Sequence, residues 1–184
     1  YAVSFDKGII TPKFVVSDVP VNFSGYEPEN YDGKFNGLVT IEYALANSLN
    51  VPAVKVLNEL GTSTFIKALK DAGFQKIKED EEKLGLSVVL GGCGATLEEL
   101  TKLYCCFANY GTFRHIKWLR ANALPLWRPD SFHLISPSAA FMVTEILTKL
   151  TRPDLPYQWQ NSSHLPKVAW KTGTSYGRRD AWSI

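Results

Sequence analysis

The chain has 184 residues, of which 45% are apolar and 21% are charged. That length suits one domain or a large piece of one, and the composition excludes a chain that is disordered throughout. The net charge of +2 is too small to indicate a nucleic-acid partner. Three cysteines form no closed disulfide framework, and widely separated histidines lack metal-ligand spacing. We therefore predict no metal site and no cofactor.

The apolar spacing predicts a mainly α fold with a small β part. Helices are predicted, in chain order, over residues 1–7, 39–47, 52–60, 62–72, 97–108 and 136–150. Residues 10–32 are rich in Pro, Gly and Asn and predict an irregular loop. The charge run at residues 76–83 predicts a solvated loop. A strand is predicted over residues 167–172, with residues 181–184 as the start of its hairpin partner.

The first chemical motif is Lys171-Thr172-Gly173-Thr174, at the end of the predicted strand. Strand alternation sends the Thr172 and Thr174 side chains to the same side, where two hydroxyls can grip one carboxylate. Gly173 lets a ligand backbone lie close against the strand, and Lys171 adds positive charge. Together they suit a peptide that ends in a carboxylate and adds to a sheet edge. Taken alone, the motif fits an ordinary exposed strand end equally well.

The second motif is Ser48-Leu49-Asn50, in the predicted break between two helices. In a non-helical segment, residues two apart can face the same way, so a hydroxyl and an amide can point together into a cleft. Ser and Asn are also common helix-capping residues, and Asn50 stands just before Pro52. Taken alone, this motif is better explained by capping.

Together the two motifs are more specific. Penicillin-binding proteins and class A β-lactamases combine a Ser-x-x-Lys nucleophile, a Ser-x-Asn element and a Lys-Thr-Gly strand. Here the second and third occur in that order, about 120 residues apart. Five longer stretches also resemble segments of class A penicillin-binding proteins: residues 6–12 (DKGIITP), 26–33 (YEPENYDG), 44–54 (ALANSLNVPAV), 90–111 (LGGCGATLEELTKLYCCFANYG) and 170–182 (WKTGTSYGRRDAW). The last is similar to the variant typical of the penicillin-binding protein 1C type.

This resemblance implies the helical portion of a transpeptidase domain, with a fold like that of serine β-lactamases and an incomplete sheet. Residues 1–184 are then expected to be a partial domain, truncated at both ends, without the start of the nucleophile helix and without the following strands. A glycosyltransferase domain and a membrane anchor are expected in the missing N-terminal part of a bifunctional parent enzyme. The resemblance places such an enzyme on the periplasmic face of the bacterial inner membrane.

The resemblance also implies roles in peptidoglycan cross-linking, in which a serine attacks the penultimate D-Ala carbonyl of a stem peptide. Ser48 would relay a proton to the leaving amine, and Asn50 would bind the substrate amide. Lys171 would support the charge network. Thr172 and Thr174 would bind the terminal carboxylate beside Gly173, and the Thr174 N–H would form half of the oxyanion hole. Stem peptides ending in D-Ala-D-Ala and β-lactams would share the cleft.

Two rival functions stay open on the same fold. A serine β-lactamase would need a carboxylate that activates water, and no Glu here lies in the local pattern known for that role. A β-lactam- or muropeptide-binding sensor module would retain the same motifs. The only Ser-x-x-Lys match, Ser4 to Lys7, lies against Gly8 at a predicted helix C-terminus, so the chain alone is predicted to be inactive. An unpaired strand edge is expected to promote self-association.

Overall fold

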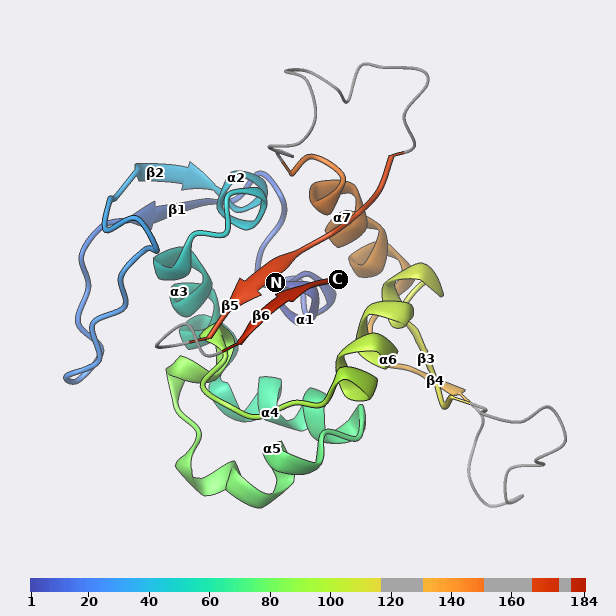
Figure 1. The fold of residues 1–184 in the computed structure, drawn as a ribbon. Coiled ribbons are helices and arrows are strands. Elements are labelled where there is room, and N and C mark those ends of the chain that lie inside the picture. The colour runs from blue at the N-terminus through green and yellow to red at the C-terminus, as the bar shows by residue number, and fades with distance from the viewer. Residues whose placement is uncertain (117–130, 151–166, 176–179) are drawn as a thin grey trace, which may run out of the picture.

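The computed structural model describes residues 1–116, 131–150, 167–175 and 180–184, so part of the segment 170–182 lies outside the described residues. The fold is mainly helical with a small β part, as predicted (Figure 1). The helices are α1 (Ala2–Asp6), α2 (Ile41–Ala46), α3 (Asn50–Leu60), α4 (Thr62–Asp71), α5 (Gln75–Asp80), α6 (Leu97–Ala108) and α7 (Pro137–Leu147), with 3-10 turns η1 (Glu81–Lys83) and η2 (Leu86–Leu90). No helix among these described residues is long and apolar enough to cross a membrane.

The strands form three separate antiparallel pairs. These are β1 (Val15–Asp18) with β2 (Gly37–Thr40), β3 (Thr112–Arg114) with β4 (Ser131–His133), and β5 (Thr172–Thr174) with β6 (Ala181–Ser183). The ribbon of β5 and β6 crosses the front of the helical body in Figure 1, and the C-terminus lies at the end of β6. Among the described residues β5 pairs only with β6. The other edge of β5 is therefore the strand edge through which self-association is expected.

Two predicted loops were wrong in part. The predicted loop 10–32 contains β1, which pairs with β2 from Val15 opposite Thr40 to Asp18 opposite Gly37. The β-branched residues Val15 and Val16 outweigh the turn-forming composition around them. The pairing also converts the start of the predicted helix 39–47 into a strand, so that α2 begins only at Ile41.

The charge run 76–83 is helical and not a loop. Lys76 forms ion pairs with Glu79 and Asp80, both at 3.1 Å, which are the three- and four-residue spacings of a helix face. The one apolar residue of the run, Ile77, is fully buried and fixes the helix against the body of the molecule. A single apolar anchor among charges is too weak a periodic signal to read from sequence.

One hydrophobic core joins most of the helices, with α3 and α7 contributing many of the buried side chains. The apolar faces of α1 and α7 pack together, and α7 also packs on α2 and α6. This packing fixes α2 and α3, the two helices that flank the Ser48 motif.

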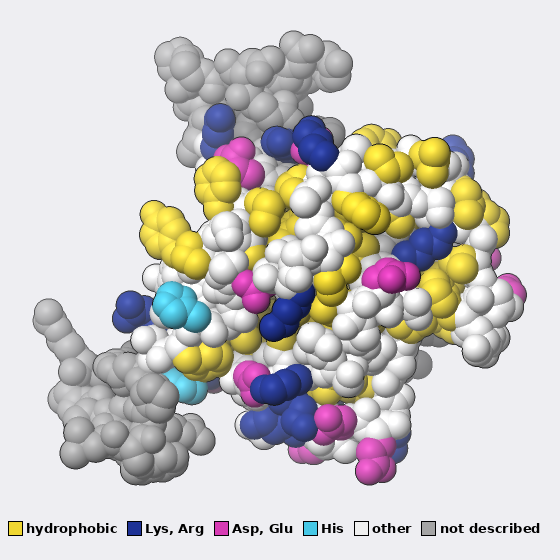
Figure 2. All heavy atoms as spheres, turned by 180° about the vertical axis from the view of Figure 1, so that it is seen from behind, with side chains coloured by type: hydrophobic (Ala, Val, Ile, Leu, Met, Phe, Trp, Pro, Cys, Tyr) yellow, Lys and Arg dark blue, Asp and Glu magenta, His cyan; other side chains and the backbone are white. Residues whose placement is uncertain are grey.

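The face in Figure 2 carries basic and acidic side chains side by side, with no large surface of one sign.

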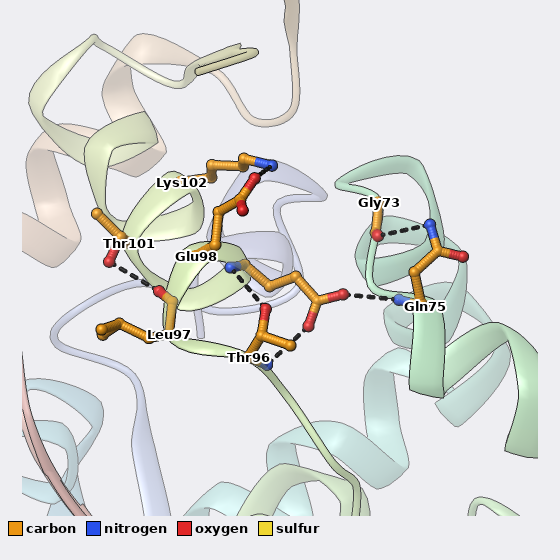
Figure 3. A network of polar contacts seen from close by, with 8 residues as sticks. Gly73, Gln75, Thr96, Leu97, Glu98, Thr101 and Lys102 are labelled. Atoms are coloured by element: carbon orange, nitrogen blue, oxygen red, sulfur yellow. Dashed lines mark hydrogen bonds and ion pairs between the residues drawn. The ribbon is translucent and has the colours of Figure 1, made fainter. Parts of the chain in front are cut away.

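Glu99 joins the starts of two helices, α5 and α6. Thr96 and Glu99 form a capping box at the start of α6, with Thr96 N donating to Glu99 Oε2 at 2.8 Å. The other carboxylate oxygen accepts the backbone N–H of Gln75, the first residue of α5, at 2.8 Å (Figure 3). Burial raises the pKa of Glu99, but the hydrogen bonds from Thr96 and Gln75 outweigh it and hold that pKa below its ordinary value.

We expect this carboxylate to make stability pH-dependent. A lowered folded-state pKa adds stability above the unfolded pKa of Glu99 and loses it as the pH falls through the folded value. The variant Glu99→Gln has only one side-chain oxygen for two N–H groups, so it should cost about 1–3 kcal/mol at pH 7 and less at pH 3. Urea unfolding at both values measures this. The control Glu98→Gln removes an exposed acid of the same turn, and an equal loss in both variants would contradict the prediction.

Candidate active site

The Ser48 hydroxyl is presented by a tight turn between α2 and α3. The N–H groups of Ser48 and Leu49 bond back to the carbonyls of Leu45 and Ala44, at 3.2 and 2.9 Å. This closure places Ser48 in the left-handed region, at φ 55°, which costs a non-glycine residue about 1–3 kcal/mol. Strain of this kind persists only where the surroundings impose it.

Lys171 reaches this turn from the C-terminal ribbon. Its backbone continues the pairing of β5 with β6, since the N–H groups of Lys171 and Ile184 each bond to the carbonyl of the other, at 2.7 and 3.0 Å. Its Nζ donates to Ser48 Oγ at 2.5 Å and to the Thr172 carbonyl at 2.6 Å. The structure therefore brings the two sequence motifs into direct contact.

The charge of Lys171 has no acidic partner among the described residues, in contrast to the ion-paired lysines of α4 and α5. Burial lowers the pKa of the half-buried Lys171 ammonium, because desolvation disfavours its charged form. An ammonium without a carboxylate neighbour can bind an anion. With a lowered pKa it can also exchange a proton with the Ser48 hydroxyl that it contacts.

The side chains of the other predicted site residues do not join this contact. Asn50 is the first residue of α3, and its Nδ2 donates to the Glu29 carbonyl at 2.8 Å. Thr172, Gly173 and Thr174 are exposed on β5, and no described group bonds to either threonine hydroxyl. Both threonines are thus open to a ligand, and their binding roles stay predictions.

Neither Ser48 nor Asn50 caps α3, so the capping alternative does not describe this turn. The N-cap residue is Leu49, which has no side-chain hydrogen bond. The cap comes from Asn30, whose Oδ1 accepts the N–H groups of Asn50 and Val51 at 2.8 and 3.3 Å. Sequence reasoning missed Asn30, although it lies in the segment YEPENYDG on which the family resemblance partly rests.

The sequence comparisons identify the class of protein. The family described as "Penicillin binding protein transpeptidase domain" matches residues 1–179, and the chain belongs to that family. It is 38% identical over 187 residues to penicillin-binding protein 1C of Escherichia coli, the type that residues 170–182 resemble. It is 26% identical over 205 residues to penicillin-binding protein 1A of Neisseria lactamica. The whole chain aligns in both cases, but it spans only 23% and 25% of the lengths of these relatives.

Solved structures of low sequence identity share the fold. Penicillin-binding protein 1A of Haemophilus influenzae superposes with a TM-score of 0.76 at 19% identity. The match covers the whole of this chain and 34% of the Haemophilus chain. The PonA1 protein of Mycobacterium tuberculosis, solved in complex with penicillin V, superposes with a TM-score of 0.75 at 19% identity. The match covers the whole of this chain and 54% of the PonA1 chain. The helical body and its ribbon are therefore the transpeptidase-domain fold predicted from the motifs.

Proposed function

We propose that this chain acts as part of a serine-type D,D-transpeptidase that cross-links peptidoglycan stem peptides ending in D-Ala-D-Ala. The observation that carries the proposal is the contact of Lys171 Nζ with Ser48 Oγ. Several known members of the family are named as penicillin-binding proteins, which supports β-lactams as further ligands. We place the working enzyme at the periplasmic face of the inner membrane, with a glycosyltransferase and an anchor in the remainder of the protein.

Each residue of the site has a defined task in acyl transfer. When the peptide bond before the terminal D-Ala breaks, the leaving nitrogen needs a proton. Ser48 Oγ accepts a hydrogen bond from Lys171 Nζ, so its own proton is free to pass to that nitrogen while a Lys171 proton replaces it. The proton that the attacking serine releases then restores the Lys171 ammonium. Asn50 then orients the substrate amide. Thr172 and Thr174 receive the terminal carboxylate, Gly173 admits the substrate backbone, and the Thr174 N–H supports the oxyanion.

A chimera tests this proposal. The segment of E. coli penicillin-binding protein 1C that aligns with this chain is replaced by the chain, so that the remainder supplies the nucleophile. We expect a fluorescent penicillin to acylate the chimera, and Lys171→Ala to lower the acylation rate by roughly 10²–10⁴-fold, as for loss of a general acid or base. Lys167→Ala, which removes an exposed lysine four positions away, should leave the rate unchanged.

Three results of the chimera experiment separate the alternatives. A folded chimera that takes no penicillin, or a Lys171→Ala variant that reacts at the full rate, would contradict the proposed site. Rapid turnover of penicillin would indicate a β-lactamase. A stable adduct without cross-linking of stem peptides would indicate a sensor module.

A further inference from the structure

A buried carboxylate lies at the end of β1, the strand that packs against α3. Asp18, the last residue of β1, is fully buried and forms no ion pair within the described part of the chain. Its two oxygens accept the Asn30 Nδ2 group at 2.8 and 2.9 Å. Oδ2 also accepts the backbone N–H and the Nδ2 group of Asn36, at 2.9 and 2.7 Å. Burying a charge costs several kcal/mol unless such bonds replace its water, so Asp18 binds these amides firmly.

The orientation of the Asn30 amide follows from Asp18. Asn30 is 5% exposed, and its NH₂ group donates to the Asp18 carboxylate and to the Lys34 carbonyl, the latter at 2.8 Å. Only the NH₂ end of an amide can donate, so its oxygen must point the other way. That oxygen faces the first two N–H groups of α3. Asp18 therefore determines which end of Asn30 meets the helix.

The segment that carries Asp18 and Asn30 makes further bonds to two side chains of α3. The Glu29 carbonyl, one residue before Asn30, accepts Asn50 Nδ2 at 2.8 Å. On the other side, Lys55 of α3 donates to the carbonyl and hydroxyl of Ser17 at 2.8 and 2.7 Å, next to Asp18. The loop thus bonds to α3 at its first residue, Asn50, and again in its middle, at Lys55.

We propose that Asp18 and Asn30 are positioning residues of the candidate active site, a role that rests on the proposed function. Asn50 is only two residues from Ser48, whose left-handed turn needs outside support. Asn30 supplies the helix cap that Leu49 cannot, and Asp18 orients Asn30. Loss of either residue releases the start of α3, relaxes the Ser48 turn, and opens the contact between Ser48 and Lys171.

The test uses the chain itself and four variants. Asn30→Asp keeps the shape and the acceptor oxygen of Asn30, but it sets a second carboxylate against Asp18. Asp18→Asn removes the charge with little change of shape. The matched control is Asn22→Asp, the same chemical change in the same loop at an exposed residue that bonds to Glu27. Val143→Ala, in the core of α7, lowers stability without touching the loop.

The readout is the titration of the Lys171 amine. Trace acetylation at a series of pH values, followed by peptide mass spectrometry, gives the pH midpoint at which the Lys171 amine becomes reactive. A change in the accessibility of the amine alters the rate of acetylation but not this midpoint. In the starting chain and both controls, the midpoint should lie below the ordinary pKa of lysine. In Asp18→Asn and Asn30→Asp it should rise by about half a pH unit, roughly a threefold loss of free amine near neutral pH, since Lys171 regains water.

Hydrogen exchange gives a second readout at the helix start, where the amides of Asn50 and Val51 should exchange at least about tenfold faster in Asn30→Asp. If both loop variants lose stability as Val143→Ala does but leave the Lys171 midpoint unchanged, Asp18 and Asn30 are merely structural and the proposal fails. It fails equally if neither loop variant folds. These measurements involve no penicillin, so they can succeed where the chimera experiment fails, and the reverse also holds.

Discussion

The 184-residue chain, incubated with a fluorescent penicillin, is expected to take up no covalent label. Its only Ser-x-x-Lys tetrad runs from Ser4 to Lys7. Ser4 is fully buried in α1, and no described group bonds to its hydroxyl. Lys7 is exposed at the C-terminal end of that helix and borders an open hollow that Ser4 does not line. The serine is therefore inaccessible to a β-lactam, and the loss of a nucleophile can reduce a rate by about a millionfold.

Intact-mass measurement after overnight incubation checks this result. Ser4→Ala should behave as the unmodified chain does, and the chimera described above provides the positive control for the penicillin. A stoichiometric adduct that maps to Ser4 would show that α1 opens to solvent and that the tetrad is a working nucleophile.

Replacing Phe113 by alanine is expected to remove a large part of the stability of the fold. Phe113 in β3 is 1% exposed, the largest fully buried side chain in the part of the chain that the structure describes, and its ring centroid lies 5.2 Å from that of Phe132. Loss of a buried phenylalanine costs about 3–5 kcal/mol, because a cavity replaces its contacts. Since a domain is stable by only about 5–15 kcal/mol, the urea midpoint should fall sharply or folding should fail.

The matched control is Phe141→Ala on α7. Phe141 is 64% exposed, so its removal should change the free energy of unfolding by no more than about 0.5 kcal/mol. Urea unfolding followed by circular dichroism measures both variants. Equal effects of the two substitutions would mean that β3 does not pack on the core as described.

The sequence predicted the helices where apolar spacing and a capping residue coincide. Thr96 and Ser136 each accept a backbone N–H three residues on, and α6 and α7 begin where these residues predict. The helix α5 was missed because its start is capped by Glu99, which lies 24 residues away in sequence. The strands β1, β3 and β4 were missed because three or four residues carry too little alternation to identify a strand.

The candidate site also combines residues that a local motif predicts with residues that only the folded structure reveals. Ser48 and Lys171 each belong to a short motif that can be recognised locally, and the family supplied the expectation that the two motifs meet. Asp18 and Asn30 act across the loop on a helix that starts 20 residues after Asn30, and polar residues in such a loop read only as turn formers. Their contacts depend on how the loop folds over α3, which no local pattern encodes.

The separation of Ser48 from Lys171 has a consequence for the growing chain. The two residues are 123 positions apart, so a ribosome that adds about 5–20 residues per second makes Ser48 roughly 6–25 seconds before its partner. During that interval the turn lacks its contact with Lys171. Asp18, Asn30 and Asn36 all precede Ser48, so the groups that fix the start of α3 are already present when the helix emerges. The nascent chain can thus form the start of α3 and the Ser48 turn before the strand β5 is synthesised.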